Sequence, residues 1–130
     1  MKKLDEASKA IFKDSVDSLQ NLCHGIAKDS GWWTDKDGNR LERNKGELLC
    51  LIHSEISECM EGVRKGLLDD HLPDRKAEEV ELADALIRIL DYAGGYGLDL
   101  GGALVDKLAY NTQRLDHKMK YRMKDGGKKF

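Results

Sequence analysis

The chain has 130 residues, of which 40% are hydrophobic and 35% charged, with a formal net charge of −2. This length suits one domain with a single core, and the composition is typical of a soluble helical protein. The absence of a basic excess argues against stable nucleic-acid binding. No apolar run approaches the roughly 18 residues of a membrane span, and the start lacks the apolar stretch of a signal peptide. We therefore expect a cytoplasmic protein with no membrane partner.

Hydrophobic periodicity predicts four helices joined by turn-rich segments, and no strand. The predicted helices cover approximately residues 7–29, 44–64, 75–92 and 103–123. Gly31 and Gly66 are expected to end the first two helices, and Asn44 to cap the second. The prediction is a single all-α domain over residues 1–130 with a four-helix bundle core and a basic C-terminal tail over about 119–130.

The second and third predicted helices each carry two acids, three residues apart, beside their apolar positions. Glu55 and Glu58 lie in LIHSEISECMEG, and Glu81 and Asp84 lie in EEVELADALIRIL. Residues at this spacing project from one side of a helix, and the short connection favours antiparallel packing, so the two pairs can face each other. Either pair alone would be typical of a solvated helix face.

Four carboxylates facing one another would repel strongly and would be costly to keep ionised away from water. A bound cation resolves this conflict. Oxygen ligands favour Mg²⁺ first, with Mn²⁺ as a substitute. A di-iron bundle would need Glu-x-x-His pairs, and none occurs in this sequence.

The fourth predicted helix carries a polar stripe. Lys107, Asn111 and Arg114 stand at positions i, i+4 and i+7, and Lys118 extends the stripe by one turn. A point charge, an amide and a forked guanidinium suit a polyphosphate and a sugar. The alternative is that the cations are surface charges paired with nearby acids.

Several segments together resemble a known family. EISE followed by ELAD, then GLDL and the KLAYNTQR segment, are similar to the E-x-x-E, E-x-x-D and K-x-x-x-N-x-x-R signatures of the MazG-type all-α nucleoside triphosphate pyrophosphohydrolases. The resemblance covers about residues 19–118. Many relatives carry another glutamate where this chain has Ser54, so the identity of the general base stays open.

The resemblance implies Mg²⁺-dependent cleavage of a (d)NTP between the α and β phosphates, giving a (d)NMP and pyrophosphate for nucleotide-pool control. It implies Glu55, Glu58, Glu81 and Asp84 as metal ligands. Glu58 is our candidate for the general base, because its position beside both pairs is the most central. The family also implies a homodimer or homotetramer. The compact form is similar to the phage-encoded MazZ branch, which suggests dGTP or GTP as substrate.

Both tryptophans, Trp32 and Trp33, precede the second predicted helix. Aromatic rings stack on bases with about 1–3 kcal/mol each. Relatives use aromatic residues of this region for the base, and Trp33 is our candidate for that role. The alternative is that one of the two tryptophans forms part of the core.

A different class of function is also open. The C-terminal segment RLDHKMKYRMKDGGKKF is basic and could dock an acidic partner or nucleic acid. The chain would then be a non-enzymatic helical interaction module.

Overall fold

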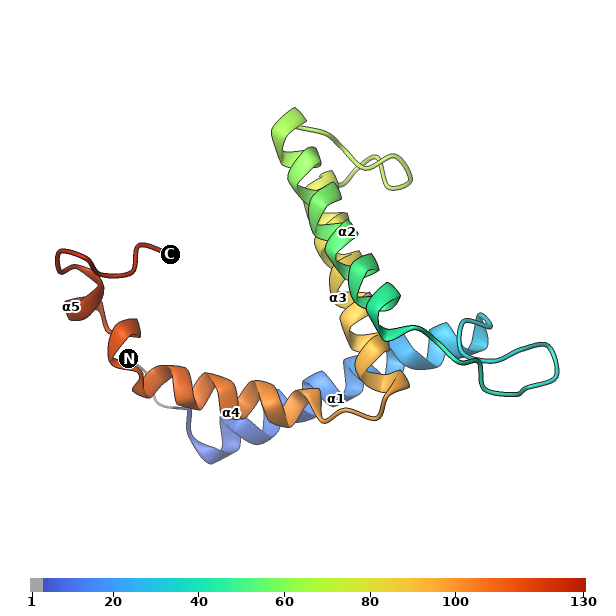
Figure 1. Cartoon of the computed structure of the whole chain (residues 1–130), viewed down its shortest axis with the longest axis horizontal. Coiled ribbons are helices and arrows are strands. Elements are labelled where there is room, and N and C mark those ends of the chain that lie inside the picture. Colours follow the sequence, from blue (N-terminus) through green and yellow to red (C-terminus); the bar gives the residue numbers. More distant parts are fainter. Residues whose placement is uncertain (1–3) are drawn as a thin grey trace. The chain divides into compact units, whose positions relative to one another are not determined.

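The structure is a computed structural model that describes residues 4–130, and the regular elements of this range are all helices (Figure 1). Its elements are α1 (Glu6–Asp29), α2 (Lys45–Lys65), α3 (Ala77–Gly95), α4 (Leu100–Gln113), the 3-10 turn η1 (Leu115–His117) and α5 (Met119–Arg122). Within the described range, β-pairing is limited to two isolated bridges, Thr34 with Arg40 and Leu68 with Lys76. The predicted all-α class is confirmed. Among residues 4–130, none of the helices combines the length and the apolar character needed to cross a bilayer.

The predicted ends of the second helix are confirmed in detail. The side chain of Asn44 accepts a hydrogen bond from the Glu47 amide at 3.1 Å, which satisfies one of the free N–H groups at the start of α2. Gly66 follows the helix with a φ of 62°, and its N–H bonds to carbonyl groups of the last turn. This left-handed conformation favours glycine, so the sequence signal at Gly66 was a strong one.

The prediction of one continuous helix over residues 103–123 is wrong. The helix α4 ends at Gln113, and Arg114 has an extended backbone with φ −65° and ψ 130°. The Arg114 guanidinium donates two hydrogen bonds to the Asp116 carboxylate, at 3.0 and 2.6 Å. This local pair accompanies the break between α4 and the short turns that follow. Arg114 and Lys118 therefore do not continue a helical stripe that begins at Lys107.

The chain divides into two compact units. One comprises residues 19–98, which include α2, α3 and the later part of α1. The other comprises the chain up to Ser18 together with Asp99–Phe130. In this second unit, Lys13 Nζ lies 2.6 Å from Asp17 and 3.2 Å from Asp99, so it links the start of α1 to the cap of α4. The single domain and the four-helix bundle stay predictions.

The helices α2 and α3 lie side by side and run antiparallel, as the short connection predicts (Figure 1). Small residues allow the close approach: a Cβ added at Gly62 would come within 2.9 Å of the Ala77 Cβ. The connecting loop is ordered by the buried Asp69, whose Oδ1 accepts hydrogen bonds from the amides of His71 and Leu72 at 2.9 and 2.6 Å. This hairpin sets the relative positions of the acids on the two helices.

Candidate metal centre

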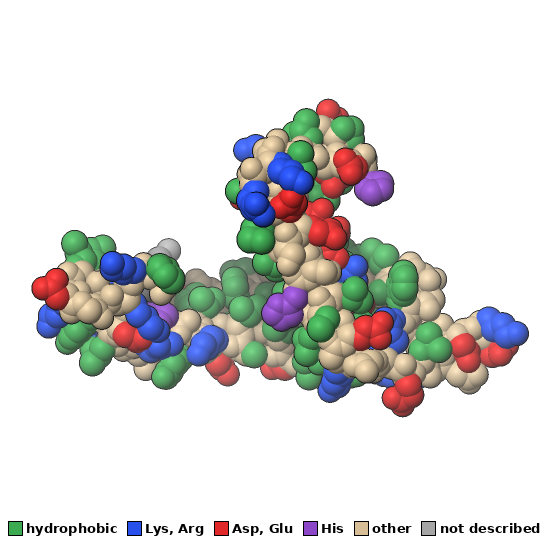
Figure 2. Space-filling view, turned by 45° about the horizontal axis from the view of Figure 1, so that its top comes forward, with side chains coloured by type: hydrophobic (Ala, Val, Ile, Leu, Met, Phe, Trp, Pro, Cys, Tyr) green, Lys and Arg blue, Asp and Glu red, His purple; other side chains and the backbone are tan. Residues whose placement is uncertain are grey.

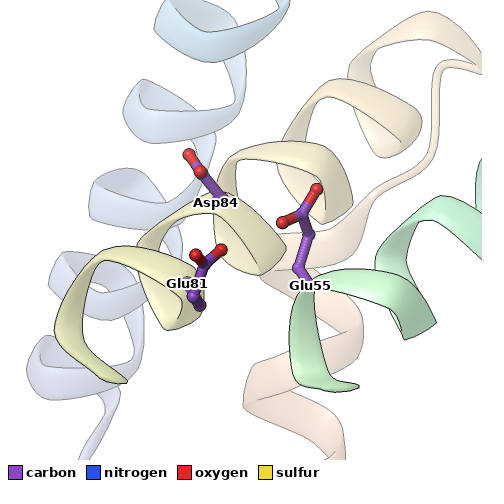
Figure 3. Close-up of side chains that lie close together, drawn as sticks. All are labelled: Glu55, Glu81 and Asp84. Carbon is purple, nitrogen blue, oxygen red and sulfur yellow. The ribbon is translucent and has the colours of Figure 1, made fainter. Parts of the chain in front are cut away.

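Three of the four predicted ligands come together in the α2–α3 hairpin. Glu55 of α2 and Glu81 and Asp84 of α3 each offer one oxygen atom, and these atoms lie within 4.8 Å of one another. Figure 3 shows Glu55 reaching from its helix toward the two acids of α3. Glu55 is buried, with 7% of its surface exposed, whereas Asp84 is exposed and Glu81 is intermediate. The cluster is therefore buried on the α2 side and accessible on the α3 side.

The environment of the cluster disfavours the charged form of Glu81. The pKa of Glu81 is raised from 4.5 to about 7, first because burial disfavours its charged form and second because the Glu58 charge repels it. A hydrogen bond with Glu55 and the charges of Glu55 and Asp84 act in the same direction. Near neutral pH, Glu81 is therefore partly protonated, and a bound cation would favour its charged form.

The donor set fits a hard divalent cation. All three side chains supply carboxylate oxygens, which suit Mg²⁺, Mn²⁺ or Ca²⁺ better than metals that prefer nitrogen or sulfur. Three protein ligands would leave coordination positions for water or for phosphate oxygens. The three acids can thus hold a divalent cation.

Glu58, our candidate general base, lies at the edge of this cluster. It is exposed and does not belong to the set of three converging oxygens, yet its charge acts on Glu81. It lines a pocket of about 170 Å³ in the same unit, together with acidic side chains of the hairpin. The acids of this pocket are Glu58, Glu61, Asp69, Asp70 and Glu81. The catalytic role of Glu58 stays a prediction.

A residue that the sequence analysis did not single out completes the cluster. Arg88 of α3 donates a hydrogen bond from Nε to Glu55 Oε1 at 2.6 Å, forming an ion pair between the two helices. Arg88 stands four residues after Asp84 and seven after Glu81, a spacing that places it on the same side of α3. That spacing is the signal by which it could have been found.

Trp33 has a different environment from the one expected of a base platform. The residue is only 3% exposed, and its Nε1 donates a hydrogen bond to Asp91 at 2.8 Å. His24 and Tyr96 contact it edge-on, with ring centroids 5.3 and 5.5 Å away. Its burial favours the alternative interpretation, a tryptophan in the core, because neither face of the ring is free for a nucleobase. Trp32, at 62% exposure, carries the accessible ring.

The four polar residues predicted to bind the polyphosphate lie in the unit that contains α4. Lys107 is exposed, with its Nζ 5.1 Å from the centre of the Tyr110 ring. Asn111 is half-buried, and its Oδ1 has no hydrogen-bond partner among the described residues. Arg114 pairs with an acid, as the alternative interpretation has it, and Lys118 is exposed. Their role toward a nucleotide stays a prediction.

Compared with protein-family models, with curated proteins and with solved structures, the chain matches none. Its function is therefore inferred from the residues and their geometry.

Proposed function

We propose that the chain is a Mg²⁺-dependent nucleoside triphosphate pyrophosphohydrolase, which cleaves a (d)NTP between the α and β phosphates to give a (d)NMP and pyrophosphate. The observation that carries the proposal is the convergence of Glu55, Glu81 and Asp84 from two helices onto one point. Each of these acids belongs to one of the two pairs for which the resemblance to the MazG-type family implies metal binding.

The proposed reaction requires the three acids to hold a cation and a further acid to accept a proton. A divalent cation held by the three carboxylates would neutralise charge on the phosphates and lower the pKa of an attacking water. Glu58, beside the cluster, would accept the proton of that water. The pKa of Glu81 is raised to about 7, so its charge is unfavourable, and a bound cation would favour the charged form.

The proposed substrate is a purine nucleotide, dGTP or GTP, on the resemblance to the MazZ branch. Since Trp33 is buried, we propose the exposed Trp32 as the ring that stacks on the base. Replacing Trp32 with alanine should then raise KM with little change in kcat. An unchanged KM would contradict this role.

We also propose that the chain acts as a homo-oligomer with a four-helix bundle core, either a dimer or a tetramer. Apolar side chains of the α2–α3 hairpin remain open to solvent, with exposures from 48% to 58%. These side chains are Ile56, Met60 and Val63 on α2, and Leu82, Leu86 and Ile87 on α3. Figure 2 shows hydrophobic side chains among the charged ones on the visible surface of the protein. Apolar patches of this kind favour association between copies.

Sedimentation equilibrium tests the oligomer. The wild type should sediment as a dimer or tetramer, and Leu86→Glu should dissociate it. The matched control is Leu72→Glu, which places the same charge at a leucine of similar exposure (53%) in the loop before α3. A stable wild-type monomer, or equal effects of the two substitutions, would contradict the proposal.

Hydrolysis is tested by chromatography of a mixture of all ribo- and deoxyribonucleoside triphosphates incubated with the protein and Mg²⁺. One or two of the triphosphates should be converted to monophosphate and pyrophosphate. Asp84→Asn should abolish this activity, whereas Glu79→Gln, an exposed acid on the same helix, should retain it. Formation of diphosphate and phosphate would refute cleavage between the α and β phosphates. An unchanged mixture would refute the proposed enzymatic activity.

A second candidate function rests on the C-terminal segment. A pocket of about 870 Å³ there combines cationic and apolar side chains. Its lining is His117, Lys118, Met119, Arg122, Met123, Lys128 and Lys129. Such a surface suits an acidic partner or a phosphate backbone, as an interaction module would require. A salt-sensitive gel shift with nucleic acid that survives Asp84→Asn would favour it.

A further inference from the structure

The ion pair between Arg88 and Glu55 places a cationic side chain at the carboxylate cluster. Arg88 Nε donates to Glu55 Oε1 at 2.6 Å, and one carboxylate oxygen of Glu55 belongs to the group of converging oxygens. The contact uses only Nε. Within residues 4–130, neither of the two Nη groups of Arg88 has a hydrogen-bond partner, and 42% of the side chain is exposed. Arg88 therefore has donor capacity left for an anion.

Arg88 and a bound cation are alternative partners for the charge of Glu55. Glu55 is buried, so its charge needs a partner, and Arg88 supplies that partner. A divalent cation at the cluster would satisfy Glu55 as well, but it would then stand within a few ångströms of the Arg88 guanidinium. Two positive groups at such a distance repel each other, so Arg88 opposes binding of the cation alone.

A polyphosphate changes this balance. Its oxygens would lie beside any cation held by Glu55, Glu81 and Asp84, within reach of a side chain that already contacts Glu55. A guanidinium presents paired N–H groups in a planar fork, which matches phosphate oxygens and forms strong charge-assisted hydrogen bonds. The negative phosphate also screens the repulsion between the cation and Arg88.

We propose that Arg88 is a substrate-binding residue that couples cation binding to polyphosphate binding: it pairs with Glu55 in the metal-free protein and donates its free N–H groups to the substrate's phosphates once the cation is bound. This inference rests on the proposed function and adds to it a residue and a coupling between cation binding and polyphosphate binding. Arg88 thereby disfavours a site loaded with the cation alone and favours one loaded with the cation and the triphosphate together.

The test compares two affinities in Arg88→Gln and in the wild type. Electron paramagnetic resonance of free Mn²⁺ measures cation binding without nucleotide, and calorimetry in excess Mg²⁺ measures binding of inorganic tripolyphosphate, a probe without a base. Arg88→Gln should bind Mn²⁺ about threefold more tightly, because a repelling charge is gone. It should bind tripolyphosphate about tenfold more weakly, because charge-assisted hydrogen bonds are lost.

Two further variants control the result. Arg75→Gln removes an exposed arginine whose nearest acid, Glu79, is 3.9 Å away, and both affinities should match the wild type. Arg88→Lys keeps a cation beside Glu55 and so guards against a misfolded variant. It should retain wild-type Mn²⁺ affinity but bind tripolyphosphate about threefold more weakly, since lysine lacks the planar fork.

The outcomes separate this inference from the proposed function. A wild type that hydrolyses nucleotides, with an Arg88→Gln variant whose tripolyphosphate affinity is unchanged, would overturn the role of Arg88 alone. Weaker Mn²⁺ binding by Arg88→Gln would overturn the predicted competition and leave Arg88 as a support for Glu55. A wild type that binds no Mn²⁺ and hydrolyses nothing would overturn both.

Discussion

Replacing Glu81 by glutamine is expected to stabilise the metal-free protein at pH 8 and to change its stability little at pH 5. The pKa of Glu81 is raised to about 7 in the folded chain, and an unfolded glutamate titrates near 4.5. As the pH rises from 4.5 to 7, the unfolded chain loses this proton while the folded chain keeps it, so the folded state loses stability. Above pH 7 both states are ionised and the loss is complete.

The size of the effect follows from the two pKa values. Raising a carboxyl pKa from 4.5 to about 7 corresponds to about 3.4 kcal/mol at 1.36 kcal/mol per pH unit, an upper bound for this group. Glu81 is only partly buried, so solvent screens much of the interaction. Between pH 5 and pH 8, we expect the wild type to lose about 1 kcal/mol of stability through Glu81. Glu81→Gln should not show this loss.

Urea unfolding in EDTA at the two pH values measures this difference. The control is Glu79→Gln, which removes an exposed acid from the same helix and should shift stability equally at both pH values. If Glu81→Gln changes the free energy of unfolding by the same amount at pH 5 and pH 8, the pKa of Glu81 is not raised by its burial and its acidic neighbours. A variant less stable than the wild type at pH 8 would also refute the reasoning.

Three other results are expected. Mg²⁺ should raise the Tm of the wild type more at pH 8 than at pH 5, because protons compete for the carboxylates, and an equal shift would contradict a carboxylate site. Gly62→Val should cost about 1–3 kcal/mol in urea unfolding, since its Cβ would meet Ala77, and a neutral outcome would contradict the helix contact. Trp33→Phe should lower the free energy of unfolding by about 1–3 kcal/mol, because Asp91 loses its indole donor. Trp32→Phe should lower it by less than about 0.5 kcal/mol, and equal losses would contradict the burial of Trp33.

The positions of α2 and α3, and most of the carboxylate cluster, could be predicted from the sequence because their causes are local. The Asn44 cap and the Gly66 stop act within one turn of the chain. The pairs at i and i+3 project from one side of each helix, and a short loop between two helices leaves antiparallel packing as the simple solution. Glu55 and Glu81 meet for these reasons.

The end of α4 could not be predicted in the same way. The apolar periodicity continues past Gln113, so pattern alone favours a longer helix. The chain instead adopts an extended conformation at Arg114, whose guanidinium pairs with Asp116 two residues later. Local side-chain pairing of this kind competes with helical geometry, and hydrophobic periodicity contains no information about it.

The amino-acid sequence by itself determined where the first three helices of this protein form and which acids share a helix face, because both depend on neighbours a few residues apart. The tertiary structure decided which of two adjacent tryptophans is buried, and it paired Glu55 with Arg88, a residue 33 positions away. These outcomes depend on where the helices cross and which side chains remain open to water. Contacts of that kind exist only once distant segments of the chain have packed together.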